Sequence, residues 1–173
     1  MSEHLPQSPD IKVGYVQHRF LVAFGCALVI LLERALGHWV LFFDASPLLS
    51  YLYVGFLALY FPAILPAGIV CLLGLFADFL ALDPFGVRTF TLTGFYLLVR
   101  WRAVEIIDED FITIWSQMAL YVMAIALVRL ACYFGLYVSF PDLLSLAYQT
   151  GMTILIFPIL FVIGKSLAAI LQR

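Results

Sequence analysis

The sequence predicts an all-α membrane protein, a six-transmembrane-helix bundle with both termini in the cytoplasm. Hydrophobic residues make up 65% of the 173-residue chain and charged residues only 12%, a balance far outside that of ordinary soluble domains. Long apolar runs alternate with short turns that contain proline and helix-capping residues. Lysine and arginine gather on one side of the expected bundle, which is typical of cytoplasmic segments.

The chain is expected to divide into a flexible cytoplasmic tail, residues 1–18, and one transmembrane domain, residues 19–173. The tail contains Pro6, Pro9 and mixed charges without an apolar period. No small-residue cleavage site follows the first apolar run, so this run is expected to be a retained span. The six expected spans cover residues 19–43, 48–62, 65–82, 87–101, 112–138 and 143–170.

The second and third spans are expected to be short. Residues 48–82 form a stretch of 35 residues with one charge, and at about 1.5 Å per residue this is too long for one crossing of a roughly 30 Å core. Pro62 and Pro66 divide it into two helices. Pro158 lies inside the sixth span, where we expect it to kink the helix.

An even number of spans places both termini on the same side of the membrane. On that side lie six basic residues, Lys12, Arg19, Arg100, Arg102, Lys165 and Arg173, whereas only Arg88 borders the other side. The positive-inside rule therefore predicts cytoplasmic termini for this multi-pass membrane protein. Trp39, Trp101 and Trp115 are expected at the interfaces, as an aromatic belt.

No enzymatic motif is present, and we expect neither activity nor cofactor nor metal. The chain lacks a metalloprotease motif, a nucleophile elbow and a phosphate-binding glycine loop. The net charge of −2 without a basic cluster argues against nucleic acid as a partner. The three dispersed cysteines are expected to be packing residues. The acidic stretch 105–110 is either a solvated loop or a docking site for a basic cytoplasmic partner.

A carboxylate lies inside the apolar stretch 74–86, at Asp78. Because lipid excludes a charge, Asp78 is expected to face the interior of the bundle and to be paired. One helix face carries residues at spacings of three and four, most of them small: Ala67, Cys71, Gly74, Asp78 and Ala81. Such a face permits close approach of another helix. We expect Gly74 to be a contact that accepts alanine but not leucine.

A helix boundary is expected within this stretch, after Leu82. Asp83 would cap the next helix and Pro84 would occupy its first position. The turn then ends at Gly86. A shared metal site of Asp78 and Asp83 is the weaker interpretation, because the turn separates them.

Ionisable residues within the expected spans all fall in the outer half of the membrane: Glu33, Arg34, Asp78, Arg129 and, at the rim, Arg88. They are either structural ion pairs that lock helices together or a solute-binding pocket or proton path open to the outside. Counting at about 1.5 Å per residue places Asp78 and Arg34 at similar depth, roughly 18 to 21 Å above the inner boundary. We therefore expect these two to pair.

The residues Gly74-Leu75, Asp78, Pro84 and Gly86, followed by a long apolar segment, resemble the MreD family of bacterial rod shape-determining proteins, whose members carry a G-L-x-x-D motif and a turn ending in glycine. Thr153 to Pro158 is similar to the last helix of that family. One departure is the neutral turn at residues 62–66, where family members often carry a basic residue.

The resemblance implies a fold like that of the substrate-binding subunits of energy-coupling-factor vitamin transporters, which are six-helix bundles. It implies a non-enzymatic component of the cell-elongation machinery in the bacterial cytoplasmic (inner) membrane. This component is a partner of MreC and works with MreB filaments, the RodA polymerase and its transpeptidase in controlling cell shape and peptidoglycan synthesis. Fold similarity alone does not carry transport with it. The alternative is a transporter subunit that binds a small, vitamin-like solute.

Overall fold

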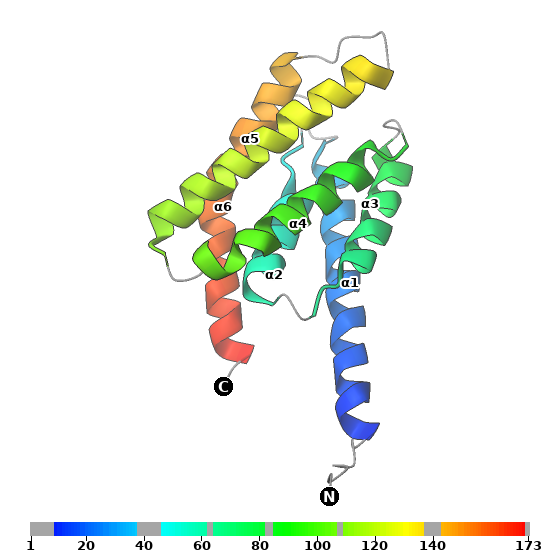
Figure 1. The fold of residues 1–173 in the computed structure, drawn as a ribbon, viewed down its shortest axis with the longest axis vertical. Helices are drawn as coiled ribbons and strands as arrows, with labels where there is room; N and C mark the ends of the chain where they lie inside the picture. Colours follow the sequence, from blue (N-terminus) through cyan, green and yellow to red (C-terminus); the bar gives the residue numbers. More distant parts are fainter. Residues whose placement is uncertain are drawn as a thin grey trace, which may run out of the picture.

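A computed structural model describes residues 9–37, 46–61, 64–81, 85–106, 109–136 and 143–171, and the side chains of 19–37, 46–61, 64–80, 85–106, 109–135 and 143–162. Within these ranges the chain is all-helical, as predicted (Figure 1). Its helices are α1 (Pro9–Gly37), α2 (Leu49–Tyr60), α3 (Ala67–Ala81), α4 (Val87–Ile106), α5 (Phe111–Leu136) and α6 (Leu143–Leu171).

In the part of the chain that the structure describes, three helices are long and apolar enough to cross a membrane, and their spans are Arg19–Gly37, Phe111–Gly135 and Leu143–Val162. In contrast, α2 has 12 residues and α3 has 15, which correspond to about 18 and 23 Å. Both are shorter than a hydrocarbon core of about 30 Å. The class of membrane protein is therefore supported by these three helices, while the six-span arrangement stays a prediction.

The short helix α2 lies in the interior of the bundle. It packs against α1, α4 and α6, and most of its residues are buried, including Tyr51, whose ring meets Phe95 of α4 edge-on at 5.7 Å between centroids. A helix that is apolar on every side is typical of a buried element. Protein rather than lipid therefore surrounds much of α2, and its small length is compatible with that position.

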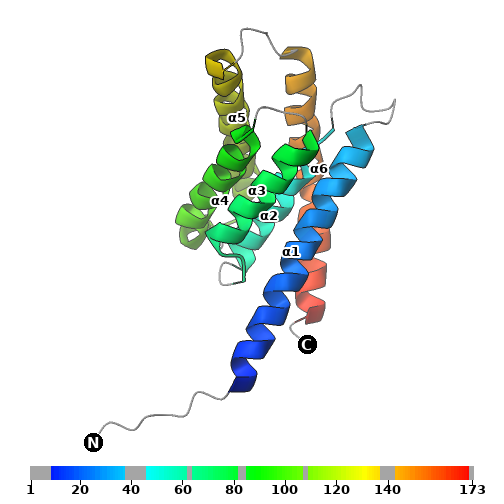
Figure 2. The ribbon, with the colours of Figure 1, turned by 90° about the vertical axis from the view of Figure 1, so that its right-hand side faces the viewer.

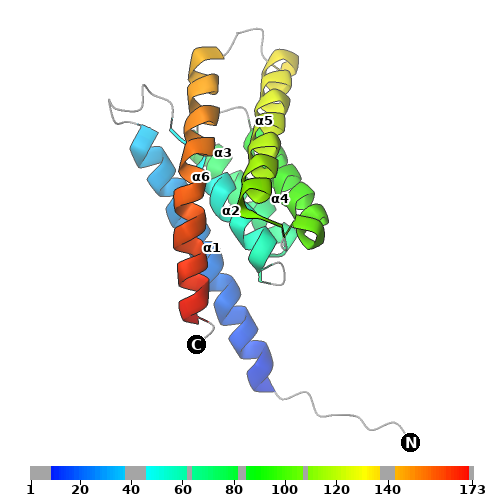
Figure 3. The same cartoon turned by 90° about the vertical axis from the view of Figure 1, so that its left-hand side faces the viewer.

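The start of α1 and the end of α6 lie at the same end of the molecule (Figure 1). Figures 2 and 3 show that the first turns of α1 extend beyond the neighbouring helices. The helix begins at Pro9, so residues 9–18 are helical where the sequence predicted a flexible tail. The lack of an apolar period and the presence of proline led to that prediction, but proline is well tolerated in the first turn of a helix, where no intrahelical partner exists for an N–H group.

Side chains of α4 form hydrogen bonds at the turn between α2 and α3. The Tyr96 hydroxyl donates a hydrogen bond to the Leu65 carbonyl and accepts one from Arg100 Nη1 at 2.7 Å. The turn carries no basic residue of its own, as the sequence indicated, yet a basic group from α4 is bonded next to it. Pro62 lies outside the described residues.

Candidate functional site

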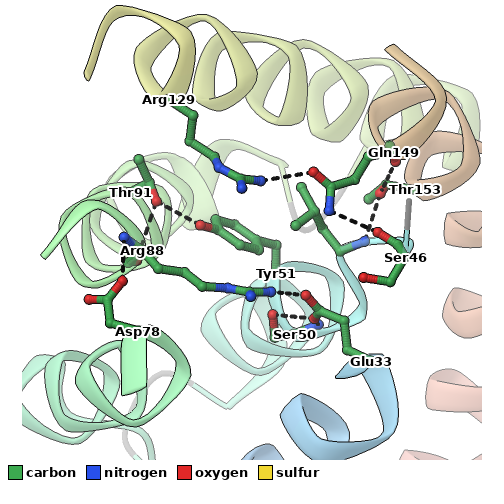
Figure 4. A network of polar contacts seen from close by, with 11 residues as sticks. Glu33, Ser46, Ser50, Tyr51, Asp78, Arg88, Thr91, Arg129, Gln149 and Thr153 are labelled. Atoms are coloured by element: carbon green, nitrogen blue, oxygen red, sulfur yellow. Dashed lines mark hydrogen bonds and ion pairs between the residues drawn. The ribbon is translucent and has the colours of Figure 1, made fainter. Parts of the chain in front are cut away.

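A buried polar network occupies the end of the bundle opposite the start of α1 (Figure 4). Every helix contributes to it, and we define it by the residues Glu33, Ser50, Tyr51, Asp78, Arg88, Thr91, Arg129, Gln149 and Thr153. Of the five ionisable residues predicted to share one depth, four belong to this network. Glu33, Asp78, Arg88 and Arg129 are each at most 7% exposed.

The central ion pair of the network joins Glu33 of α1 to Arg88 of α4. The second carboxylate oxygen of Glu33 accepts hydrogen bonds from the Ser50 backbone N–H at 3.0 Å and from its hydroxyl at 2.6 Å. One carboxylate thereby connects α1, α2 and α4. Arg88 was expected at the outer rim; instead its side chain is 7% exposed and points inward.

Asp78 binds the N-terminus of α4 rather than an arginine side chain. Its Oδ1 accepts the Arg88 backbone N–H at 2.9 Å. Its Oδ2 accepts the N–H groups of Gly86 and Thr89, both at 3.1 Å, and the Thr89 hydroxyl at 2.5 Å. The first N–H groups of a helix have no intrahelical acceptor and carry partial positive charge. Asp78 therefore acts as a helix cap supplied by the preceding helix.

The predicted pair between Asp78 and Arg34 is wrong. Among the described residues the ion pairs are Arg88 with Glu33 and Arg102 with Glu105. Arg34 is half-buried, and its Nε has no hydrogen-bond partner in the structure. Because consecutive residues lie about 100° apart around a helix, Arg34 cannot face the same way as Glu33, which occupies the interior position.

Glycines set the close contact between α3 and α4. A Cβ added to Gly74 would lie 2.6 Å from the Thr89 Cα, so the prediction of a helix–helix contact at Gly74 is confirmed. The expected tolerance of alanine is contradicted by the same distance.

Gly86 has φ +95°, a conformation that glycine adopts without strain. Asp83 and Pro84, predicted to cap and begin α4, lie outside the described residues.

A second branch of the network connects α5 and α6 to the start of α2. Arg129 Nη1 donates to Gln149 Oε1 at 3.0 Å, and Gln149 Nε2 donates to the Ser46 carbonyl at 2.9 Å. The Thr153 hydroxyl accepts the Leu48 N–H at 2.9 Å and donates to the Gln149 carbonyl at 2.6 Å. These contacts satisfy backbone groups next to α2.

Neutral members of the network were missed as site residues by the sequence reasoning. Besides Gln149, they include Tyr51 and Thr91, whose hydroxyls lie 2.7 Å apart, and Ser50. The available signal was the position of polar side chains inside apolar helices, at the same depth as the ionisable residues. Thr153 was singled out only through the family resemblance.

Pro158 lies within α6, which continues through it. Proline has no N–H, so the carbonyl four residues earlier, that of Ile154, has no intrahelical donor. The Trp115 indole N–H of α5 donates to this carbonyl at 3.1 Å. Trp115 is half-buried and joins α5 to α6 at the proline, and its place in an interfacial aromatic belt stays a prediction.

The carboxylates of the network are bonded to protein groups. Glu33 and Asp78 each accept hydrogen bonds on both oxygens, and the two acids and two arginines balance in formal charge. In the described part of the chain, no group of three histidine, cysteine or acidic residues could hold a metal ion. The geometry agrees with structural ion pairs and caps that lock helices together.

Comparison with protein-family models, with curated proteins and with solved structures found no match to this chain.

Proposed function

We propose that the chain is a non-enzymatic integral membrane component of the bacterial cell-elongation complex. In this proposal it is an MreD-like protein of the inner membrane that binds MreC and helps to control cell shape and peptidoglycan synthesis. MreB, RodA and the elongation transpeptidase are its further partners. The proposal rests on the G-L-x-x-D motif and on the structural use of its residues.

The observation that carries the proposal is that the residues of the motif hold α3 against α4. Gly74 provides the close approach, Asp78 caps α4, and Gly86 supplies the positive φ of the turn. A catalytic carboxylate needs access to a substrate, whereas Asp78 is 2% exposed and accepts four hydrogen bonds. A motif that only maintains shape suits a scaffold with fixed binding surfaces.

The alternative, a subunit that binds a small vitamin-like solute, requires polar groups that are available to the solute. The network lies at the end where such a pocket would open, but both of its carboxylates are used to hold helices. This use of the charged groups favours the scaffold.

Deletion of the gene in its own bacterium tests the proposal. We expect the cells to become round, and the tagged chain to retain MreC when it is purified from its own membranes and analysed by mass spectrometry for proteins and small molecules together. Gly68→Ala, at an exposed position of α3 with open space around it, is the control that should restore rod shape. Intact rod shape combined with a new vitamin requirement would replace the scaffold by the transporter subunit.

A further inference from the structure

A groove of about 490 Å³ lies between α4 and α5, at the end of the molecule away from the polar network. We call it the α4–α5 groove. Its lining comes from the last turns of α4 and the first turns of α5: Leu98, Trp101, Arg102, Ser116, Gln117, Leu120 and Tyr121. None of these side chains takes part in the network described above, so the groove is a separate feature.

The walls of the groove combine apolar surface with hydrogen-bonding groups. Trp101 is 76% exposed and Leu120 is 62% exposed. Gln117 Oε1 accepts the Tyr121 hydroxyl at 3.0 Å, which leaves the amide NH₂ of Gln117 as a donor. Exposed tryptophan beside polar groups is typical of the level where acyl chains meet lipid headgroups.

A cation and an anion lie side by side at the rim of the groove. Arg102 Nη1 donates to Glu105 Oε2 at 2.7 Å, and the two side chains are 46% and 66% exposed. The guanidinium also lies over the Trp101 ring, 5.5 Å from its centroid. An exposed pair of this kind adds little to folding stability, so both groups can exchange their mutual contact for a charged ligand.

The surrounding charges favour a zwitterionic ligand over an anionic one. Glu109 and Asp110, in the connection between α4 and α5, are exposed and add negative charge near Glu105. A lipid with net negative charge would meet this repulsion. A phosphate with an ammonium group close to it matches one arginine and one carboxylate, and the ammonium group offers three N–H donors, as lysine does.

We propose that the α4–α5 groove binds phosphatidylethanolamine. The phosphate contacts Arg102 and the Gln117 amide, the ammonium group contacts Glu105, and an acyl chain lies along Leu98 and Leu120. Phosphatidylcholine has the same phosphate but no N–H donor, and phosphatidylglycerol lacks the cation. The groove therefore distinguishes these three headgroups. The lipid proposal does not depend on the function proposed above.

The full-length chain, purified in detergent and incubated with each of these three lipids bearing identical acyl chains, tests the proposal by native mass spectrometry. We expect phosphatidylethanolamine to be retained about fivefold better than phosphatidylcholine, the factor that one net hydrogen bond of ~1 kcal/mol provides. Glu105→Gln should reduce this preference, because a neutral amide oxygen is a weaker acceptor than a carboxylate, and Arg102→Gln should weaken the retention of both lipids. Arg102→Lys keeps the charge and should retain both.

Matched controls are Glu109→Gln and Arg19→Gln, which make the same chemical changes at exposed positions outside the lining. Both controls should keep the preference for phosphatidylethanolamine over phosphatidylcholine, because both lipids are neutral overall, and thermal unfolding should show every variant folded. Glu109→Gln should change only the retention of phosphatidylglycerol, since it removes part of the repulsion. Equal retention of phosphatidylethanolamine and phosphatidylcholine would overturn the proposal, as would a preference for phosphatidylglycerol or an unchanged preference in Glu105→Gln. Disulfide cross-linking of Ser116→Cys between two copies of the chain would assign the groove to protein instead.

Discussion

At the scale of single residues, Asp78 shows how a buried charge is stabilised without an ion pair. Its carboxylate accepts three backbone N–H groups and one hydroxyl at the start of α4. The first-turn N–H groups of a helix supply both hydrogen bonds and partial positive charge. The negative charge is therefore compensated by backbone, and the arginines remain available for Glu33 and Gln149.

We predict that Asp78→Leu destabilises the protein by about 3 kcal/mol, because buried N–H donors lose their acceptor. Thermal unfolding of the purified protein in detergent measures this change. The double exchange Asp78→Arg with Arg34→Asp should be no better than Asp78→Leu, since an arginine cannot accept these bonds. If the double exchange recovered the stability, this result would support an ion pair between residues 78 and 34 and would contradict the capping role of Asp78.

We also predict that Gly74→Ala destabilises the protein by about 1–3 kcal/mol, the usual cost of overpacking. The added Cβ would meet the Thr89 Cα at 2.6 Å, and a backbone atom cannot rotate away. Gly68→Ala on the same helix, where nothing lies within 4 Å, should be neutral or slightly stabilising. Equal midpoints of thermal unfolding for the two variants would contradict a close α3–α4 contact.

The sequence was sufficient to predict which ionisable residues lie at a similar depth but not how they pair. Spacing along each helix gave the depth of the ionisable residues, and four of five meet in one network. Pairing also depends on the direction that each residue faces around its helix and on where the helices end. Those directions come from packing between helices, which periodicity alone does not specify for helices apolar on nearly every side.

At the scale of helices, the Glu33–Arg88 pair joins three elements of different chain segments. Both partners are buried, and Ser50 occupies the remaining carboxylate oxygen. Removal of one partner leaves the other charge without compensation in a medium of low polarity. The pair therefore fixes α1 against α4 more strictly than apolar contacts do.

We predict that Glu33→Gln costs about 3–5 kcal/mol, whereas the double variant Glu33→Leu with Arg88→Leu costs much less. The measurement is thermal unfolding together with the amount of protein that accumulates in the membrane. Glu105→Gln, in the exposed pair with Arg102, is the control and should change stability by no more than ~1 kcal/mol. If the double variant were as unstable as Glu33→Gln, an unpaired charge would not be the cause.

Pro158 and Trp115 form a second connection between helices. The proline leaves the Ile154 carbonyl without its intrahelical donor, and the indole N–H replaces that donor at 3.1 Å. We predict that Trp115→Phe costs about 1–2 kcal/mol from the unsatisfied carbonyl, beyond any loss of packing. In a Pro158→Ala background the restored N–H should reduce this cost, which a double-mutant cycle measures. Additive effects would show that the two residues act independently.

At the scale of the whole molecule, the helical class and the order of six helices agree with the sequence prediction. The two short helices, α2 and α3, show where the sequence prediction was incomplete. Proline positions indicated that residues 48–82 divide into two helices, but composition could not show that α2 is enclosed by α1, α4 and α6. An apolar helix inside a protein and one facing lipid have the same composition, and only packing distinguishes them.

The fold places charge asymmetrically along its length, and this predicts its orientation. Arg100 and Arg102 are exposed near the end of α4, and α4 runs toward the end of the molecule where α1 begins and α6 ends. Arg88, the single basic residue assigned to the other side, is buried in an ion pair and so does not act as a loop charge. Basic residues in short connections mark the cytoplasmic side.

We therefore predict that the ends of α1 and α6 and the α4–α5 connection face the cytoplasm, and that the polar network lies toward the outside. A fluorescent protein fused after Arg173 should fold and fluoresce, because it stays in the cytoplasm. Alkaline phosphatase inserted between α5 and α6, near Pro141, should be active, since it needs the oxidising exterior. If the two reporters are exchanged, neither fluorescence nor phosphatase activity is expected. An active phosphatase at Arg173 would place the end of α6 outside the membrane and would contradict this orientation.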